Sequence, residues 1–265
     1  MEDGMPPVNT QESPSNYSAG GSGYEHYSSA GMGAPMEFSV GSVISRSFST
    51  LFKNPILFFG LAILAGIPGI LMEMFASDSP GGRVLMSLLG TFFGIIFQGA
   101  VAYGVYRSLR GEGAGMGDAL ARGMARFLPL LGISIIMGFG IGIGVILLII
   151  PGLILSCIWA VTVPACVVEH LGVTASLSRS SELTKGYRWK VFGLLVCIFV
   201  IAFALSFGAV FIFTLMSNPS LVVIGAGIVA IIPAAFQNVM IATIYYDLRA
   251  VKEGVTVDSL ANVFD

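Results

Sequence analysis

The chain has 265 residues, of which 55% are hydrophobic and only 11% are charged, and its mean hydropathy is +0.87. A water-soluble protein carries about 25% charged residues, so this composition excludes an ordinary soluble domain. The net charge of −2 offers no basic face to phosphate backbones, and we therefore expect no nucleic-acid partner.

The first segment of the chain, residues 1–37, differs in composition from the rest. It is rich in Gly, Ser and Pro and has almost no aliphatic side chains. Such a segment cannot bury enough apolar surface to offset the entropy lost on folding, so we expect a disordered cytoplasmic tail. Its tyrosines are candidates for contacts with a partner, but a solvated tail without a specific role is the simpler interpretation. The predicted organisation is therefore a tail at 1–37 and a membrane domain at 38–265.

Four tracts of the sequence contain no Asp, Glu, Lys, Arg or His, namely residues 54–72, 84–106, 127–168 and 191–246. The first two suit one membrane-spanning helix of about 20 residues each, and the last two are long enough for two helices each. Pro151-Gly152 and Asn218-Pro219-Ser220 mark the expected breaks within the long tracts. The predicted fold is all-α, a polytopic membrane protein with six transmembrane helices arranged as three hairpins.

The basic residues are unevenly distributed between these tracts. Of the 13 Lys and Arg residues, all except Arg83 fall on the side of the predicted spans that also carries both chain ends. Cytoplasmic loops of membrane proteins have an excess of Lys and Arg, so we expect the N-terminus and the C-terminus to be cytoplasmic.

Each predicted hairpin is preceded by a short segment in which an arginine stands between small residues. These segments are residues 42–47, 118–123 and 175–180, and apolar residues recur around them at helical spacing. We expect three amphipathic helices at the cytoplasmic interface, with Arg46, Arg122 and Arg179 directed at anionic lipid headgroups. The alternative is that each arginine pairs within the bundle, although Arg46 has no acid within four residues. A shorter interfacial helix is predicted at 258–264.

A second similarity links the second and sixth predicted spans. Phe97-Gln98, Tyr106 and Leu109-Arg110 recur, shifted by 139 residues, as Phe236-Gln237, Tyr245 and Leu248-Arg249. We interpret this as an internal repeat, in which an interfacial helix plus a hairpin occurs three times in the same orientation about an axis along the membrane normal. Small residues four apart, such as Gly90/Gly94 and Gly140/Gly144, predict close helix packing within the bundle or, alternatively, a homo-oligomer interface.

Few residues suggest a chemical reaction. The Gly-rich run 111–117 follows a membrane helix and lacks the Lys-Ser/Thr pair of a phosphate-binding loop. Glu169-His170 is a candidate half of a metal site or proton relay, but a polar helix end near the headgroups is the simpler interpretation. The three cysteines lie in predicted spans and are expected to be packing residues. We therefore expect no catalytic residue, no metal and no cofactor.

The most polar groups within the predicted spans are Gln98, Gln237 and Asn238. Interhelical hydrogen bonds are the structural interpretation, and the lining of a polar cavity is the functional one.

Two stretches resemble a known membrane family. The first contains Pro151-Gly152-Leu153, Pro164, Val167-Val168-Glu169, Leu171-Gly172, residues 175–180, Leu183-Thr184-Lys185-Gly186 and Trp189; the second contains Tyr245-Tyr246-Asp247-Leu248-Arg249 and Glu253-Gly254. Together they resemble the six-helix membrane domain that is fused to some bacterial glycerophosphoryl diester phosphodiesterases and occurs in stand-alone uncharacterised membrane proteins. The resemblance covers roughly residues 38–264 and implies a multi-pass protein of a prokaryotic cytoplasmic (inner) membrane. It implies no catalytic residue, because the hydrolase of the fused proteins is a separate soluble domain without a counterpart in these residues.

These observations lead to an expected function. We expect a non-enzymatic integral membrane protein that acts as a scaffold or modulator of membrane- or lipid-associated components. Its expected partners are the lipid bilayer, anionic lipid headgroups and membrane proteins of unknown identity. The alternative is a small-solute or lipid transporter with a cavity near Gln98 and Gln237, whereas a membrane enzyme would need clustered acids, His or Cys at one depth.

Overall fold

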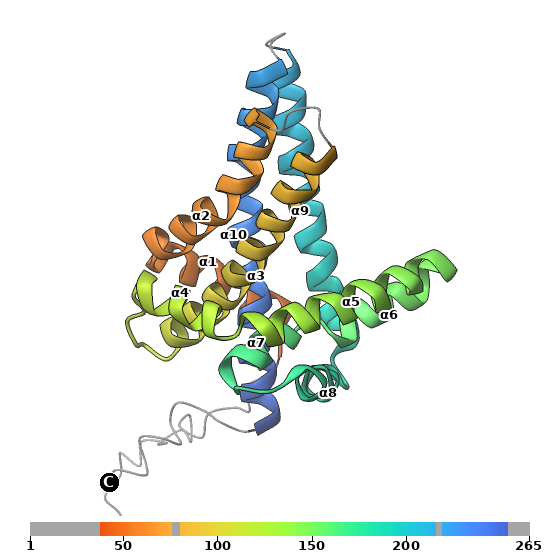
Figure 1. Ribbon diagram of the computed structural model, residues 1–265. Helices are drawn as coiled ribbons and strands as arrows, with labels where there is room; N and C mark the ends of the chain where they lie inside the picture. The colour runs from red at the N-terminus through yellow and green to blue at the C-terminus, as the bar shows by residue number, and fades with distance from the viewer. Residues whose placement is uncertain (1–37, 76–79, 216–218, 254–265) are drawn as a thin grey trace, which may run out of the picture. The chain divides into compact units, whose positions relative to one another are not determined.

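The computed structural model describes residues 38–75, 80–215 and 219–253, which all belong to one compact unit, Pro35–Asp265 (Figure 1). The predicted tail at 1–37 and the predicted helix at 258–264 lie outside the described residues. Within the described ranges the regular secondary structure is helical throughout, without a strand. Five stretches of the described residues are long and apolar enough to cross a membrane, or up to six if the bent pair α1–α2 forms one span. The fold is therefore all-helical and consistent with a membrane protein.

The helices are labelled in chain order in Figure 1. They are α1 (Val40–Lys53), α2 (Pro55–Phe75), α3 (Pro80–Leu109), α4 (Met116–Ala125), α5 (Phe127–Leu147), α6 (Ile149–Ile158), α7 (Thr162–Val168), α8 (Val173–Thr184), α9 (Arg188–Thr214) and α10 (Pro219–Glu253).

The first corner of the fold lies between α1 and α2. Helix α1 begins after Ser39, whose hydroxyl oxygen accepts the backbone N–H of Ser42 at 3.2 Å, as expected of an N-cap residue. It ends at Asn54 (φ −133°, ψ 62°), because the ring of Pro55 disfavours helical geometry in the residue before it. The two helices meet at an angle of 88°.

The hairpin formed by α5 and α6 turns at a different place from the one predicted. The break is at Leu148, which is extended (φ −161°, ψ 130°), and Pro151-Gly152 lies inside the first turn of α6. A proline is tolerated there because the first backbone N–H groups of a helix have no intrahelical partner. The two helices approach closely at the turn, since a Cβ on Gly144 would lie 2.9 Å from Cα of Gly152.

Helix α10 lies at the centre of the described packing and contacts α1, α2, α3, α7, α8 and α9. Many of its apolar residues are buried against these neighbours, among them Ala235, Val239, Met240, Ile244 and Leu248. By contrast, Phe139 of α5 and Phe203 of α9 are 69% and 59% exposed, as suits helices that face lipid.

The small residues predicted to mediate close packing do so only in part. Gly140 faces the Trp159 ring, where a Cβ would come within 2.6 Å of the indole. A Cβ on Gly90 or Gly94 would meet no described atom within 4 Å. The contact expected at Gly90/Gly94 is therefore not formed inside the described part of the bundle.

Candidate functional site

Charged and tyrosine side chains gather where α3, α7 and α10 end and where α1, α4 and α8 pack against them. Helix α10 has 35 residues, which at 1.5 Å per residue is about 50 Å, well above the roughly 30 Å of a hydrocarbon layer. Its last turns can therefore lie outside that layer. We describe three groups of residues at these helix ends.

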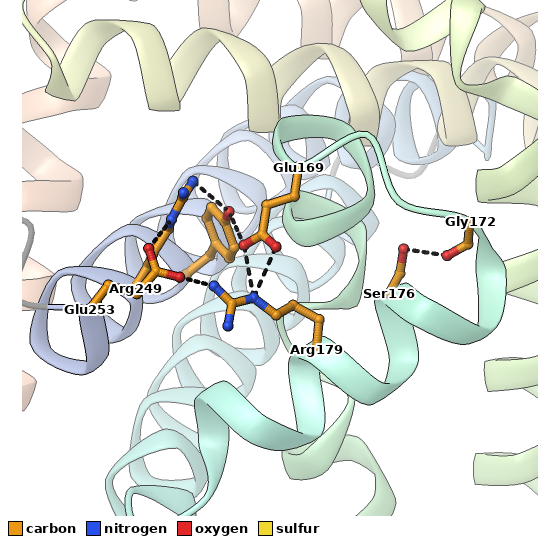
Figure 2. Close-up of polar contacts among 7 residues, drawn as sticks. Glu169, Gly172, Ser176, Arg179, Arg249 and Glu253 are labelled. Carbon is orange, nitrogen blue, oxygen red and sulfur yellow. Dashed lines mark hydrogen bonds and ion pairs between the residues drawn. The ribbon is translucent and has the colours of Figure 1, made fainter.

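The first group, the α10 cluster, contains Glu169, Arg179, Tyr245, Arg249 and Glu253 (Figure 2). The guanidinium of Arg179 lies between two carboxylates, with its Nε 3.0 and 2.9 Å from the two oxygens of Glu169 and its Nη2 paired with Glu253. The Tyr245 hydroxyl donates to Glu169 Oε1 at 2.8 Å. Arg249 donates to Glu253 Oε2 at 2.7 Å and to the Tyr245 hydroxyl at 3.3 Å. Two arginines and two glutamates thus form one continuous, charge-balanced network.

This cluster ties together residues that are distant in sequence. Glu169 follows α7, Arg179 belongs to α8, and the other three belong to the last turns of α10. Partial burial disfavours the charged guanidinium of Arg179, but its hydrogen bonds and ion pairs with Glu169 and Glu253 outweigh that effect and raise its pKa. The geometry is that of a structural ion-pair network that joins three helical segments.

The second group is the pair formed by Arg46 of α1 and Asp247 of α10. Nη1 of Arg46 contacts Oδ1 of Asp247, whose side chain is only 8% exposed. A carboxylate this deeply buried needs an opposite charge, so the pair holds α1 against α10. The two residues are 201 positions apart, so Arg46 has no acid near it in the sequence.

The third group surrounds a hollow of about 220 Å³ at the end of α3. We call it the α3 pocket; its lining residues are Tyr103, Tyr106, Arg107, Arg110, Glu112, Arg122, Val167, Val168 and His170. Arg122 of α4 places its guanidinium carbon 5.3 Å from the centre of the Tyr103 ring. Arg107 and Arg110 pair with Glu112 at 3.1 and 3.2 Å.

Close packing of α4 against α3 positions Arg122 in this pocket. The neighbouring Gly123 has no side chain, and a Cβ there would lie 2.4 Å from the carbonyl oxygen of Ile96 and 3.1 Å from the backbone nitrogen of Ala100. Only glycine permits this distance between the two backbones. The sequence Arg122-Gly123 therefore combines a charged group with the contact that brings it to α3.

His170 meets two arginines in the same region. Its Nε2 lies 3.3 Å from Nη1 of Arg122, its Nδ1 contacts Nη2 of Arg126, and its carbonyl oxygen accepts from Nη1 of Arg126 at 3.2 Å. Its backbone has φ 58°, a left-handed conformation that is uncommon outside glycine. Desolvation, together with the charges of Arg126 and Arg122, lowers the pKa of His170 below its ordinary value.

The ends of α3 and α10 each contain the same kind of tyrosine–arginine contact. Arg110 donates to the hydroxyl of Tyr106 at 3.3 Å, and Arg249 donates to the hydroxyl of Tyr245 at 3.3 Å. These four residues are among those that recur with a shift of 139 in the sequence. The matching residues therefore have matching geometry.

The polar residues predicted within the spans belong to two helices. Gln98 of α3 and Gln237 of α10 are both exposed. Asn238 is partly buried, and its side-chain amide donates to the carbonyl oxygen of Ala234 at 2.9 Å, within the same helix. Whether these residues line a cavity or bond between helices stays a prediction, as does headgroup contact by Arg46, Arg122 and Arg179.

One protein-family model matches part of the chain. Residues 131–248 match a family model described as a domain of unknown function, DUF7847. The match contains Glu169, Arg179 and Tyr245 of the α10 cluster, but not Arg249, Glu253 or Arg122. No curated protein and no solved structure matches the chain.

The candidate pair Glu169-His170 separates in the structure. Glu169 joins Arg179, and His170 joins Arg122 and Arg126. Among the described residues, no group of three or more His, Cys, Asp or Glu is placed to hold a metal ion. The sequence did not reveal the α3 pocket, although the density of Arg and Tyr between 103 and 126 is a signal that could have identified it.

Proposed function

We propose that this chain is a non-enzymatic, multi-pass protein of a prokaryotic cytoplasmic membrane that serves as a scaffold or modulator of membrane- or lipid-associated components. The observation that carries the proposal is the pairing of charged side chains at the helix ends. In the α10 cluster and the Arg46–Asp247 pair, acids and bases join helices to one another. Groups used in this way hold a shape, which is what a scaffold needs.

The proposed architecture is three hairpins, each preceded by an amphipathic interfacial helix, namely α1, α4 and α8. The angle of 88° between α1 and α2 supports an interfacial position for α1. So does the exposure of Phe48 (43%) and Phe52 (65%), which would contact acyl chains on the outer side of α1.

The contacts of the three arginines support a rotational arrangement of the hairpins. Arg122 of α4 packs on Tyr103 of α3, and Arg179 of α8 pairs with Glu169 after α7. Each arginine thus contacts the end of the hairpin before its own helix. Arg46 of α1 has no earlier hairpin and contacts α10, the last helix described, which closes a ring.

A hollow of about 330 Å³ between α6 and α9 supports contact with lipid. Ile150, Leu153, Ile154 and Phe192 line it, and Arg188 and Trp189 lie at the start of α9.

Topology is tested with reporter fusions in the full chain. A fusion after Pro219 should be extracytoplasmic, and fusions after Gly113 and Lys185 should be cytoplasmic. A fusion after Pro151 should also be extracytoplasmic if α5 and α6 span the membrane; a cytoplasmic result would instead place this hairpin beside the start of α9, where Ile150 and Arg188 line one hollow. A reversed result at Gly113 or Lys185 would contradict the proposed orientation.

The scaffold role is tested by photo-crosslinking in native membranes. A crosslinker at Phe139 or Phe203, both strongly exposed, should give discrete adducts with membrane proteins. Adducts with lipid alone at every exposed position would contradict a scaffold role.

The alternative function, transport of a small solute or a lipid, draws on Gln98 and Gln237. Two exposed amides in apolar helices are costly against lipid, and a cavity or channel would satisfy them. Purified protein in sealed vesicles should release no solute and exchange no lipid between leaflets if the scaffold proposal holds. Release that is abolished by Gln98→Leu plus Gln237→Leu would favour the transporter instead.

A further inference from the structure

The α3 pocket differs from the other two groups in its charge balance. Arg107, Arg110 and Arg122 line it, whereas Glu112 is the one acid among its described lining residues. Glu112 already pairs with Arg107 and Arg110. Within the described residues, no carboxylate lies at ion-pair distance from Arg122 or from the adjacent Arg126.

Arg122 and Arg126 both contact His170, which is a poor substitute for an anion. Both ring nitrogens of His170 face arginine N–H donors. A neutral imidazole accepts a hydrogen bond at only one nitrogen and carries a proton on the other, so it cannot satisfy both arginines. A doubly protonated ring would add a third positive charge. Either way, acceptors are in short supply at this side of the pocket.

The tyrosines add donors to the same space. The hydroxyl oxygens of Tyr103 and Tyr106 accept from Arg107 at 3.4 Å and from Arg110 at 3.3 Å. Each hydroxyl hydrogen can therefore donate in another direction. The pocket combines guanidinium groups and phenolic O–H donors around a space of about 220 Å³.

We infer that the α3 pocket binds a phosphate group, carried either by an anionic lipid headgroup or by a small soluble phosphate ester. Several charged oxygens at tetrahedral spacing satisfy more arginine and tyrosine donors at once than a single carboxylate does. The inference deepens the proposed function, because it rests on the proposed membrane location for placing α3 and its pocket at headgroup level. Of Arg46, Arg122 and Arg179, Arg122 is then the one that contacts phosphate.

The test uses the full chain purified in a non-ionic detergent and two probes. Radiolabelled inorganic phosphate in equilibrium dialysis measures binding of the free anion. Native mass spectrometry from nanodiscs of phosphatidylglycerol or of phosphatidylcholine measures retention of the lipid. Retention of phosphatidylglycerol without phosphate binding assigns the site to a headgroup, and phosphate binding without lipid preference assigns it to a soluble ester; both outcomes support the inference.

The variants are chosen in matched pairs. Arg122→Gln removes one charge-assisted contact and should weaken binding of whichever probe the wild-type chain binds by about tenfold or more. His170→Asp places a carboxylate between Arg122 and Arg126 and should also weaken it by about tenfold. The side chain in His170→Asn has nearly the same shape as that in His170→Asp, and Asn also tolerates the left-handed backbone. This variant should retain binding within about threefold. Lys185→Gln, an exposed residue outside the pocket, controls for net charge.

The result that overturns the inference is binding of neither probe, or binding that is equal in the His170→Asp and His170→Asn variants. A folding defect cannot imitate the expected result, because Asp and Asn have nearly the same size and shape and both melting temperatures are measured. Reporter fusions that place Gly113 outside the cytoplasm would overturn the proposed topology while leaving phosphate binding intact, so the two proposals fail separately.

Discussion

The ends of α10 and α3 are built from matching residues but differ in what surrounds them. Arg249 and Arg110 each contact a tyrosine four residues earlier at 3.3 Å. At α10, Glu169 and Glu253 complete the network with Arg179. At α3, the corresponding space receives Arg122 and His170 instead of a second acid.

A single step along the chain produces this difference. Glu169 turns toward Arg179, and the left-handed backbone of His170 directs the next side chain to Arg122 and Arg126. Where the charges cancel, the residues join helices. Where positive charge remains, as in the α3 pocket, the side chains can bind an anion from solution or from the lipid. The comparison teaches that charge balance, more than residue type, separates a structural contact from a binding site.

The largest expected effect comes from removing the acid that balances the α10 cluster. Glu169→Gln leaves Arg179 with one carboxylate and deprives the Tyr245 hydroxyl of its charged acceptor. We expect a loss of about 3 kcal/mol of unfolding free energy, measured by equilibrium unfolding of the purified chain in mixed micelles. Glu112→Gln, at the more exposed α3 pocket, should cost less than about 1 kcal/mol. Equal losses would remove the contrast between the two ends.

The second prediction concerns the approach of α4 to α3. Gly123→Ala adds a Cβ that would lie 2.4 Å from the Ile96 carbonyl oxygen, so α4 must shift. We expect a loss of about 2 kcal/mol of unfolding free energy in the same assay. Gly117→Ala on α4 is the control, because a Cβ there meets no described atom within 4 Å and alanine favours helix. Similar melting of the two variants would show that the approach is not tight.

The third prediction concerns the pair between α1 and α10. Asp247→Asn leaves Arg46 without its carboxylate, and we expect about 1.5 kcal/mol of destabilisation by loss of a charge-assisted hydrogen bond. Combining Asp247→Arg with Arg46→Asp restores opposite charges and should recover part of that loss. A double-mutant cycle without coupling between residues 46 and 247 would contradict the pairing.

The smallest expected effect is a pH dependence at His170. The lowered pKa means that the folded chain binds its proton less readily than the unfolded chain, whose imidazole titrates near 6.5. Stability from this group is therefore full above pH 6.5 and falls as the pH drops through the lowered value. The melting temperature of the wild type should decline slightly more between pH 7.5 and 5 than that of His170→Asn.

Arg122, Arg126, Arg107, Arg110 and Glu112 surround the ring or line the pocket beside it, and they are the same in the wild type and in His170→Asn. They contribute equally to both chains in the comparison. The same pH slope in both chains would show that His170 titrates as it does in the unfolded state.

The sequence predicted those features that depend on residues close together in the chain. Uncharged tracts predicted the long apolar helices, and the segments around Arg46, Arg122 and Arg179 are all helical. The break within 127–168 was misplaced at Pro151-Gly152, because a proline is compatible with the first turn of a helix and the close approach of Gly144 and Gly152 has no local pattern.

The contacts of the site could not be predicted from the sequence, because their partners lie far apart along the chain. Arg46 and Asp247 are 201 residues apart, and Arg179 and Glu253 are 74 apart. A search for acids within one helical turn cannot find such partners. The adjacency of Glu169 and His170 was equally uninformative, because one residue in a left-handed conformation sends the two side chains to separate groups.

The position of α10 in the chain has a consequence for biosynthesis. Asp247 and Glu253, which pair with Arg46 and Arg179, are synthesised after the residues of every other described helix. At roughly 5–20 residues per second, a ribosome needs about 10–40 s to pass from Arg46 to Asp247. During that interval Arg46 lacks its acid, and Arg179 has Glu169 but not Glu253; a premature stop before Asp247 would make that condition permanent. A membrane protease that recognises unassembled helices would then have its substrate.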